Sequence, residues 1–186
     1  MFFIRSFCPS EQQLGGLHQW IDKLRVDEEL ISKLKLRLLL VEAFVNAYES
    51  GGESKENITI IIEQQIHEGH LNIMVTDNGR GFDIDGAFGN FEGHQLGKRF
   101  LIVAHPGVSL YAIPMSPNKL RFKLIGQPYD DQYLPERNRG ILAMLNIATT
   151  VEYQYCPFSN NYLKISISKE QEKQKAIEKS FQNFGG

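Results

Sequence analysis

Two stretches of the sequence, Glu42-Ala43-Phe44-Val45-Asn46-Ala47 and Asp77-Asn78-Gly79-Arg80-Gly81-Phe82, carry most of the information about the fold and its chemistry. The first lies in a segment whose apolar residues recur at helical spacing. The second directly follows residues 71–76, where apolar and polar residues alternate as they do in a strand. Their order, and their placement on a helix and at the end of a strand, make the pair far more specific than either stretch alone.

The first stretch places a carboxylate and an amide on one helix face, because Glu42 and Asn46 are four residues apart. Asn46 could supply an oxygen ligand to magnesium, and Glu42 could accept a proton from an attacking hydroxyl or water. Taken alone, the two residues are better explained as solvated polar neighbours of a buried stripe. The stripe that we expect to face the core consists of Ile31, Leu34, Leu38, Val41, Val45 and Tyr48.

The second stretch begins with Asp77-Asn78-Gly79, which by itself is a common turn sequence, so a plain hairpin corner is one interpretation. Gly79 and Gly81 bracket Arg80 and allow a close backbone approach that side chains would block. A carboxylate on such a loop can also accept a hydrogen bond from an exocyclic amine. The residues of this stretch alone leave both interpretations open.

The remaining pattern predicts helices that cover a sheet. Helices are expected from Ser10, which can cap the first, and from Asp27, which can cap a second that stops at Gly51-Gly52. Further expected elements are a hairpin of strands 58–63 and 71–77, a helix over 138–150 and a hairpin of strands 151–155 and 163–167. This order predicts an α+β fold, a two-layer sandwich with helices on one face of a mixed, mostly antiparallel sheet.

Residues 1–168 are expected to form one domain, which contains an inserted β-rich segment at about 88–137. Within the insert, apolar runs at 100–103, 108–111 and 120–124 predict short added strands beside the site. Residues 169–186 form a tail rich in Lys, Glu and Gln. We expect this tail to be a solvated helix or a frayed end, and a partner-binding helix is the alternative.

Composition excludes several classes of function. The chain has 20 basic and 22 acidic residues and a net charge of −2, so no overall basic field predicts binding to nucleic acid or to an anionic membrane. No stretch approaches the ~20 apolar residues of a membrane helix, and the apolar start is too short for a signal peptide. Cys8 and Cys156 are isolated. They favour a reducing cytoplasm, although a bridge between them stays open, and we expect a cytoplasmic protein.

A helix with E-x-x-x-N-A, then a hairpin, then D-x-G-x-G-F resembles the GHKL ATPases of the Bergerat fold, which include gyrase B, the MutL-type repair proteins, histidine kinases and anti-sigma kinases. A third stretch, Arg137-Asn138-Arg139-Gly140-Ile141-Leu142, opens a helix and resembles the lid and phosphate-binding helix of that superfamily. Within the superfamily the chain is most similar to the anti-sigma-factor serine kinases, over nearly its whole length to about Lys169.

The resemblance implies ATP and magnesium as cofactors and assigns a role to each matching residue. Glu42 is implied as the catalytic base. The implied nucleotide-binding positions are Asn46, Asp77, Gly79, Gly81, Arg139 and Gly140. Among them, Asn46 is implied as the magnesium ligand and Asp77 as the acceptor of the adenine amine, whereas Arg139 and Gly140 mark the phosphate end.

The resemblance also implies a protein-serine kinase that phosphorylates an anti-sigma factor antagonist of the STAS type, with a sigma factor as a further partner and pairing into a homodimer. The sequence departs from that family in having Glu49-Ser50 where a basic residue and a histidine are frequent, in keeping one glycine of the lid motif, and in its longer insert. A nucleotide-binding module that regulates by association alone is the main alternative. The catalytic domain of a histidine kinase is disfavoured, because no upstream helix carries a phospho-accepting histidine.

Overall fold

The computed structural model describes residues 1–51, 57–79, 96–105, 107–126, 139–156 and 160–170. These residues form three helices and eight strands. The helices are α1 (Gln13–Lys23), α2 (Lys33–Gly51) and α4 (Arg139–Ile147), and the strands are β1 (Phe2–Phe7), β2 (Ile58–Gln65), β3 (His70–Asp77), β4 (Phe100–His105), β5 (Val108–Ser116), β6 (Lys119–Gly126), β7 (Thr150–Gln154) and β8 (Asn161–Ser168).

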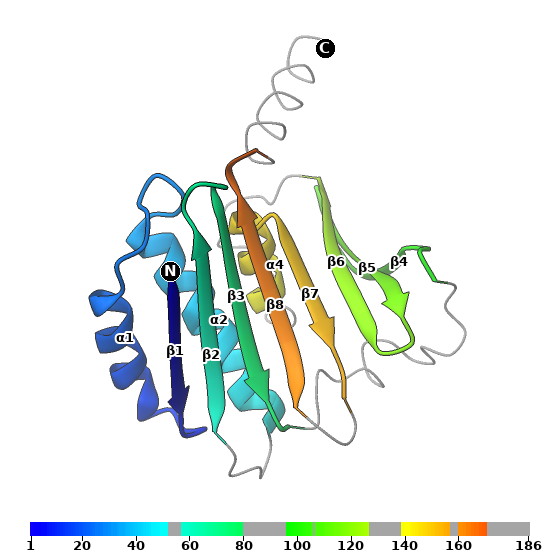
Figure 1. The fold of residues 1–186 in the computed structure, drawn as a ribbon. Coiled ribbons are helices and arrows are strands. Elements are labelled where there is room, and N and C mark those ends of the chain that lie inside the picture. Colours follow the sequence, from blue (N-terminus) through cyan, green and yellow to red (C-terminus); the bar gives the residue numbers. More distant parts are fainter. Residues whose placement is uncertain (52–56, 80–95, 106, 127–138, 157–159, 171–186) are drawn as a thin grey trace.

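The strands form one sheet in the order β1-β2-β3-β8-β7-β6-β5-β4, and the described helices lie on one side of it (Figure 1). Burial alternates along β2 and β3, with the buried side chains facing the helices, because successive side chains of a strand point to opposite faces. The predicted α+β sandwich is therefore confirmed. Each of the seven described strand pairings is antiparallel, so the parallel pairing that a mixed sheet would include is absent from the described strands.

The added strands predicted at 100–103, 108–111 and 120–124 are present as the longer strands β4, β5 and β6. They do not form a separate layer, because β6 pairs with β7 and so extends the main sheet. Leu110, Ala112, Leu120 and Phe122 from these strands belong to the common hydrophobic core. The part of the insert that the structure describes is thus an integral piece of the domain, whereas residues 88–95 and 127–137 lie outside the described residues.

The predicted buried stripe is wrong at Leu34 and Leu38, whereas Ile31 is buried just before α2 and Val41 and Tyr48 pack partly against the core. Leu34 is 77% exposed and Leu38 is 42% exposed, and the side chains that enter the core are Leu36, Leu39, Leu40, Ala43, Phe44 and Ala47. Apolar residues occur around almost the whole circumference of this helix, so its sequence satisfies helical spacing in two different phases. The sheet selects the phase that places the largest continuous set of apolar side chains over β2 and β3.

The helix starts also differ from expectation. Helix α1 begins at Gln13 without a side-chain cap, so Ser10 does not cap it. Helix α2 begins at Lys33, and the Ser32 hydroxyl accepts a hydrogen bond from the Lys35 backbone N–H at 3.4 Å. Asp27 instead closes the turn before α2, since its Oδ1 accepts from the Glu29 N–H at 3.0 Å and its carbonyl accepts from two further backbone N–H groups. Asp27 thus closes a turn of its own, and the helix starts only at Lys33.

Three aromatic rings hold the first strand and the first two helices together. Phe7 packs edge-to-face against Trp20 and against Phe44, with 5.8 Å between ring centroids in both contacts. Such contacts contribute about 0.5–1.5 kcal/mol each beyond the burial of apolar area. They attach β1 and α1 to α2, the helix that carries Glu42 and Asn46.

At the other end of the domain, Lys169 is tied to the turn before α2. Its Nζ lies 3.4 Å from Asp27 Oδ2 and 3.1 Å from Glu29 Oε2. Residues 171–186 of the predicted tail lie outside the described residues, so its solvated-helix interpretation stays a prediction. Cys8 and Cys156 are both free thiols. No helix in the described part of the chain combines the length and the apolar character needed to span a membrane.

Candidate functional site

A pocket lies where α2 and α4 meet the end of β3 and the start of β8. Figure 1 shows that β3 ends and β8 begins at the same end of the sheet, with the C-terminal half of α2 behind them. The residues that line the pocket are Ala43, Asn46, Ala47, Asp77, Ile141, Tyr153 and Leu163. Its volume is about 290 Å³ when the open solvent at its mouth is included.

Asp77 is the last residue of β3 and is only 6% exposed. Its Oδ1 accepts two hydrogen bonds, one from the Gly79 backbone N–H at 2.9 Å and one from the Asn161 Nδ2 at 3.1 Å. Burial raises the pKa of Asp77 above its ordinary value, and the hydrogen bonds from Asn161 and Gly79 partly offset that rise. The carboxylate is therefore held in one orientation, at a cost in desolvation that a hydrogen-bond donor from a ligand would reduce.

Asn161 is a site residue that the sequence did not reveal. It is fully buried at the start of β8, directly opposite Asp77 in the β3–β8 register. Its Nδ2 also donates to the Gly79 carbonyl at 3.1 Å, and its Oδ1 accepts from the Cys156 backbone N–H at 3.2 Å. In the sequence this asparagine resembles an ordinary turn residue. Only the pairing of β3 with β8 brings it to Asp77, so no local signal could have identified it.

Glu42, Asn46 and Gly140 meet at the contact between α2 and α4. A Cβ atom placed on Gly140 would lie 2.8 Å from Asn46 Nδ2, 3.0 Å from Asn46 Oδ1 and 3.0 Å from Glu42 Oε2. The first of these separations is shorter than real Cβ contacts and the other two are tighter than most, so any larger residue at position 140 would have to displace the ends of the Asn46 and Glu42 side chains. Helix α4 therefore packs its first turn directly on the predicted catalytic pair.

The Asn46 side chain carries an unpaired polar atom in the wall of the pocket. Its Nδ2 is buried and has no hydrogen-bond partner among the described residues. A buried amide without a partner costs about 1–3 kcal/mol, and such groups are rare in folded proteins unless a ligand or a water satisfies them. An unpaired amide in the wall of a pocket is what a site for a polar ligand requires.

Burial and two neighbouring charges shift the pKa of Glu42. Burial raises its pKa above the ordinary value, the positive charge of Arg139 lowers it, and the negative charge of Glu49 raises it further. A carboxylate with a raised pKa is a stronger base than a free glutamate, which is the property that proton abstraction needs. Arg139 itself is exposed at the start of α4.

The structure thus brings most of the predicted residues together. Asn46 and Asp77 line one pocket, Gly79 bonds to Asp77, and Gly140 and Arg139 open the helix that packs against Glu42. Gly81 lies outside the described residues. The apolar lining was not predicted as part of the site, because Ala43, Ala47, Ile141, Tyr153 and Leu163 have the same pattern in the sequence as other core positions.

These features are compatible with a magnesium-bound nucleotide. The pocket offers apolar walls, a fixed carboxylate for a base and an unpaired amide for a polar group. The described residues contain no cluster of three or more His, Cys, Asp or Glu that would hold a metal by itself. Magnesium does not need such a cluster, since it is usually bound by one or two protein ligands together with phosphate oxygens and waters.

Comparison with known families agrees with this geometry. The sequence matches the model of the histidine kinase-like ATPase domain over residues 12–169, which includes every described element except β1. No curated protein matches the chain.

Proposed function

Because the chain belongs to the family of histidine kinase-like ATPase domains, we propose that it binds ATP with magnesium in this pocket and transfers the γ-phosphoryl group to a serine of a partner protein. The observation that carries the proposal is the convergence of Asn46, Asp77 and Gly140 on the space between α2, α4 and the end of β3. These three residues come from three distant parts of the sequence, and each matches a position of the GHKL motifs.

Asp77 would recognise the adenine ring. Its Oδ1 is occupied by Gly79 and Asn161, and its Oδ2 has no hydrogen-bond partner among the described residues. Oδ2 is therefore the oxygen that would accept the exocyclic amine, and the two existing bonds fix its direction. Ala43, Ala47 and Ile141 supply apolar walls of the kind that enclose a planar base.

Asn46 would hold the magnesium through its amide oxygen, with Arg139 and the start of α4 at the phosphate end. The backbone N–H groups of a helix start, together with an arginine, form a site suited to anions. The missing Cβ of Gly140 lets that helix start come within contact distance of Asn46. Magnesium and phosphate ligands would thereby lie on adjacent helices that pack tightly together.

Glu42 would accept the proton of the attacking serine hydroxyl. When bound, magnesium-ATP supplies the phosphoryl group and neutralises much of its charge, so the protein has mainly to position groups and remove one proton. Glu42 lies one helical turn before Asn46, and burial raises its pKa. It is thereby placed beside the phosphate end and tuned toward basicity.

We further propose that the phosphorylated serine belongs to an anti-sigma factor antagonist of the STAS type. When unphosphorylated antagonist is absent, the protein would sequester a sigma factor in the cytoplasm as a homodimer. The support for this finer proposal is the resemblance of the sequence to the anti-sigma kinases over nearly the whole chain to about Lys169.

A nucleotide-binding module without transfer activity is the second candidate, and one observation favours it. Glu49 places a negative charge near Glu42, at a position where the anti-sigma kinases frequently carry a basic residue. This charge raises the pKa of Glu42 and adds repulsion near the phosphate end. A protein that only binds nucleotide could tolerate such a change without loss.

The experiment that separates the two candidates measures ATP binding and phosphoryl transfer in the same variants. Glu42→Ala is expected to retain ATP binding and to lower transfer to a candidate antagonist by roughly 10²–10⁴-fold. Asn46→Ala is expected to lower both magnesium-dependent ATP affinity and transfer. Glu11→Ala, at an exposed position before α1, is the control and leaves both unchanged. A wild-type protein that binds ATP tightly, yet phosphorylates no antagonist that it demonstrably binds, would leave the binding module as the answer.

A further inference from the structure

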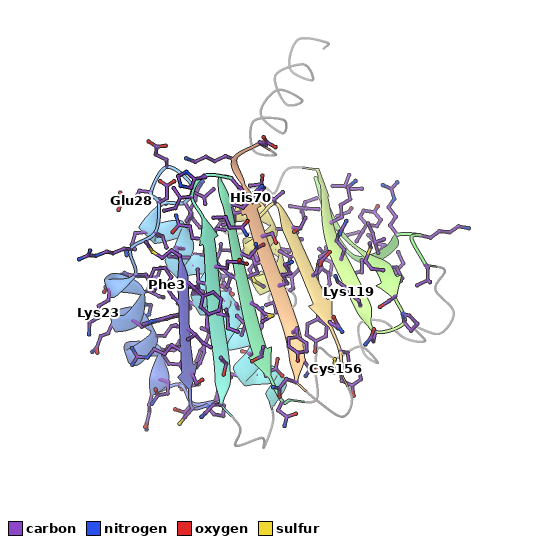
Figure 2. All side chains as sticks on the ribbon, in the orientation of Figure 1. Phe3, Lys23, Glu28, His70, Lys119 and Cys156 are labelled. Atoms are coloured by element: carbon purple, nitrogen blue, oxygen red, sulfur yellow. The ribbon has the colours of Figure 1, made fainter. Side chains whose placement is uncertain are left out.

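The face of the sheet opposite the pocket is not covered by any described helix. Figure 2 views the molecule from this side, with Lys119 labelled on β6. Asp77 and Asn161 lie among the buried residues on the helix side, so the alternation of side chains separates this face from the pocket. We call it the open face. It is defined by an apolar half, Phe2, Ile4, Ile61 and Met74, and a basic half, Lys119, Arg121, Lys123 and Lys164.

The apolar half lies on β1, β2 and β3. Phe2 is 62% exposed and Ile4 is 59% exposed. Ile4 lies opposite Ile61, and Ile61 lies opposite Met74, so the three side chains form a row across neighbouring strands. Single exposed apolar residues are ordinary, whereas a contiguous group of them marks a surface that another molecule covers.

The basic half begins where this row ends. Lys164 lies opposite Met74, Glu152 lies opposite Lys164, and Arg121 lies opposite Glu152. Burial raises the pKa of Glu152, but hydrogen bonds and charge from Lys119 at 2.8 Å and Arg121 at 2.7 Å hold it below its ordinary value. The basic half contains four cationic side chains and the one carboxylate of Glu152, so its net charge is +3.

This local positive charge contrasts with the net negative charge of the whole chain. The whole protein has a net charge of −2, yet residues 96–126 contain five basic residues and no Asp or Glu. Two of these, Lys98 and Arg99, precede β4, and the Arg99 guanidinium lies 5.2 Å from the centre of the Tyr111 ring. Lys123 lies opposite Tyr111 on the open face. The free cations, Lys123 and Lys164, form no ion pair with any described residue.

We propose that the open face binds an acidic helix of a partner protein, which crosses the strands along the row from Ile4 to Arg121, with its apolar end over β1–β3 and its carboxylates over β8, β7 and β6. Six neighbouring strands at ~4.8 Å spacing are about 24 Å wide, a width that roughly 16 residues of helix span at ~1.5 Å each. A helix is about 10 Å wide, so a helix lying along the strands would cover two of them and could not reach both halves.

Charge and surface chemistry select this occupant over the other ligands of basic surfaces. A single-stranded nucleic acid would need exposed aromatic rings among the cations, whereas Phe2 lies on β1 and the Tyr111 ring beside the cations is already contacted by Arg99. An anionic membrane presents its charge uniformly and would place some of it against Glu152, which lies between Lys119 and Arg121. A helix with an apolar end and an acidic end can match the apolar half and place its carboxylates at Lys123 and Lys164, in the mode in which helices dock on apolar surfaces.

The proposal does not depend on the chemistry of the pocket, and its test can be read separately. The probe is an 18-residue helical peptide with leucines on one side of its first half and glutamates on the same side of its second half, and the matched peptide carries lysines instead of the glutamates. We expect the glutamate peptide to bind the full chain, and the lysine peptide to bind at least tenfold more weakly. We expect magnesium-ADP affinity to be the same with and without the bound peptide, because the pocket opens on the other side of the sheet.

Two kinds of variant test the two halves of the open face. We expect the affinity for the glutamate peptide to fall by tenfold or more in Ile4→Asp. The same loss is expected in the double variant Lys123→Gln with Lys164→Gln. Lys23→Gln in α1 is the matched control at an exposed lysine on the helix side and should change nothing. An unchanged circular dichroism spectrum and an unchanged Tm in every variant show that the fold is intact. Equal binding of both peptides, or full binding by the variants, overturns the proposal. So does binding of oligo-dT or phosphatidylserine vesicles in place of the peptide, or a dimer that Ile4→Asp dissociates.

Discussion

Asn161 donates a hydrogen bond from its Nδ2 to Oδ1 of Asp77 across the β3–β8 pair, at 3.1 Å, and both residues are buried. The same amide group also donates to the Gly79 carbonyl. Asn161, from the last strand, therefore fixes the position of the Asp77 carboxylate, which is expected to accept a hydrogen bond from the adenine amine. It also fixes the position of Gly79 in the following loop. Most of the predictions below follow from such contacts between distant segments.

Replacing Asn161 by aspartate keeps the shape of the side chain but turns its donor into an acceptor. The new carboxylate would face Asp77, so the two would repel each other and share a proton. We expect ADP affinity at pH 7 to fall by roughly tenfold or more and to recover partly as the pH falls. Titration calorimetry at several pH values checks this. Asn160→Asp is the control at the exposed neighbouring position, and an equal loss in both variants would contradict the role given to Asn161.

Asp77→Asn is expected to raise the stability of the ligand-free protein at pH 7. Burial keeps the pKa of Asp77 in the folded state above its ordinary value of 3.8. The folded protein thus holds this proton more tightly than the unfolded chain, and stability is lost as pH rises through the folded-state pKa. The asparagine Oδ1 can still accept from Gly79 and Asn161. Thermal unfolding should show a higher Tm than wild type at pH 7 and no difference at a pH below 3.8.

Gly140→Ala should damage the site, because the new Cβ would lie 2.8 Å from Asn46 Nδ2 and 3.0 Å from Glu42 Oε2. Overpacking of this kind costs about 1–3 kcal/mol and must displace one of the two side chains or α4. We expect magnesium-ATP affinity to fall by about tenfold or more. Gly15→Ala in α1 is the matched control, since nothing lies within 4 Å of its new Cβ. It should stabilise the helix by about 0.5–1 kcal/mol and leave ATP binding unchanged.

The acidity of Glu42 should shift in opposite directions when its two charged neighbours are removed. Arg139 lowers the pKa of Glu42 and Glu49 raises it. If Glu42 is the base, transfer is lost as pH falls through this pKa. Arg139→Gln should therefore move the acidic limb of the pH–rate profile to higher pH, and Glu49→Gln should move it to lower pH. Shifts in the same direction, or none, would rule out Glu42 as the group that titrates.

The sequence predicted the elements with strong periodicity and the residues with motif spacing. Both hairpins, the helix that carries Glu42 and Asn46, and the three added strands are where the pattern placed them. It failed on the phase of α2, because Leu34 and Leu38 satisfy helical spacing as well as the residues that are buried. It also failed on the caps, since Asp27 completes its own turn. In each failure, a tertiary contact decided between local alternatives of similar merit.

The site was predictable only in part, for a similar reason. Asn46, Asp77 and Gly140 belong to motifs and were found from the sequence. Asn161 acts through strand pairing, and the apolar wall residues act through their place in the pocket, so neither leaves a local signal. The open face likewise follows from the register of strands that are far apart in sequence, such as β3 and β8, where His70 lies opposite Ser168.

The most direct test of the account is a calorimetric titration of magnesium-ADP and magnesium-ATP into the wild-type protein and Asp77→Asn. A charge-assisted hydrogen bond from the adenine amine to a buried carboxylate is worth about 1.5–3 kcal/mol. The account predicts that the wild type binds both nucleotides and that the variant binds both about 10–100-fold more weakly, although its fold is more stable. If the two proteins bind ADP with the same affinity, Asp77 does not read the base and the pocket between α2, α4 and β3 is not the nucleotide site.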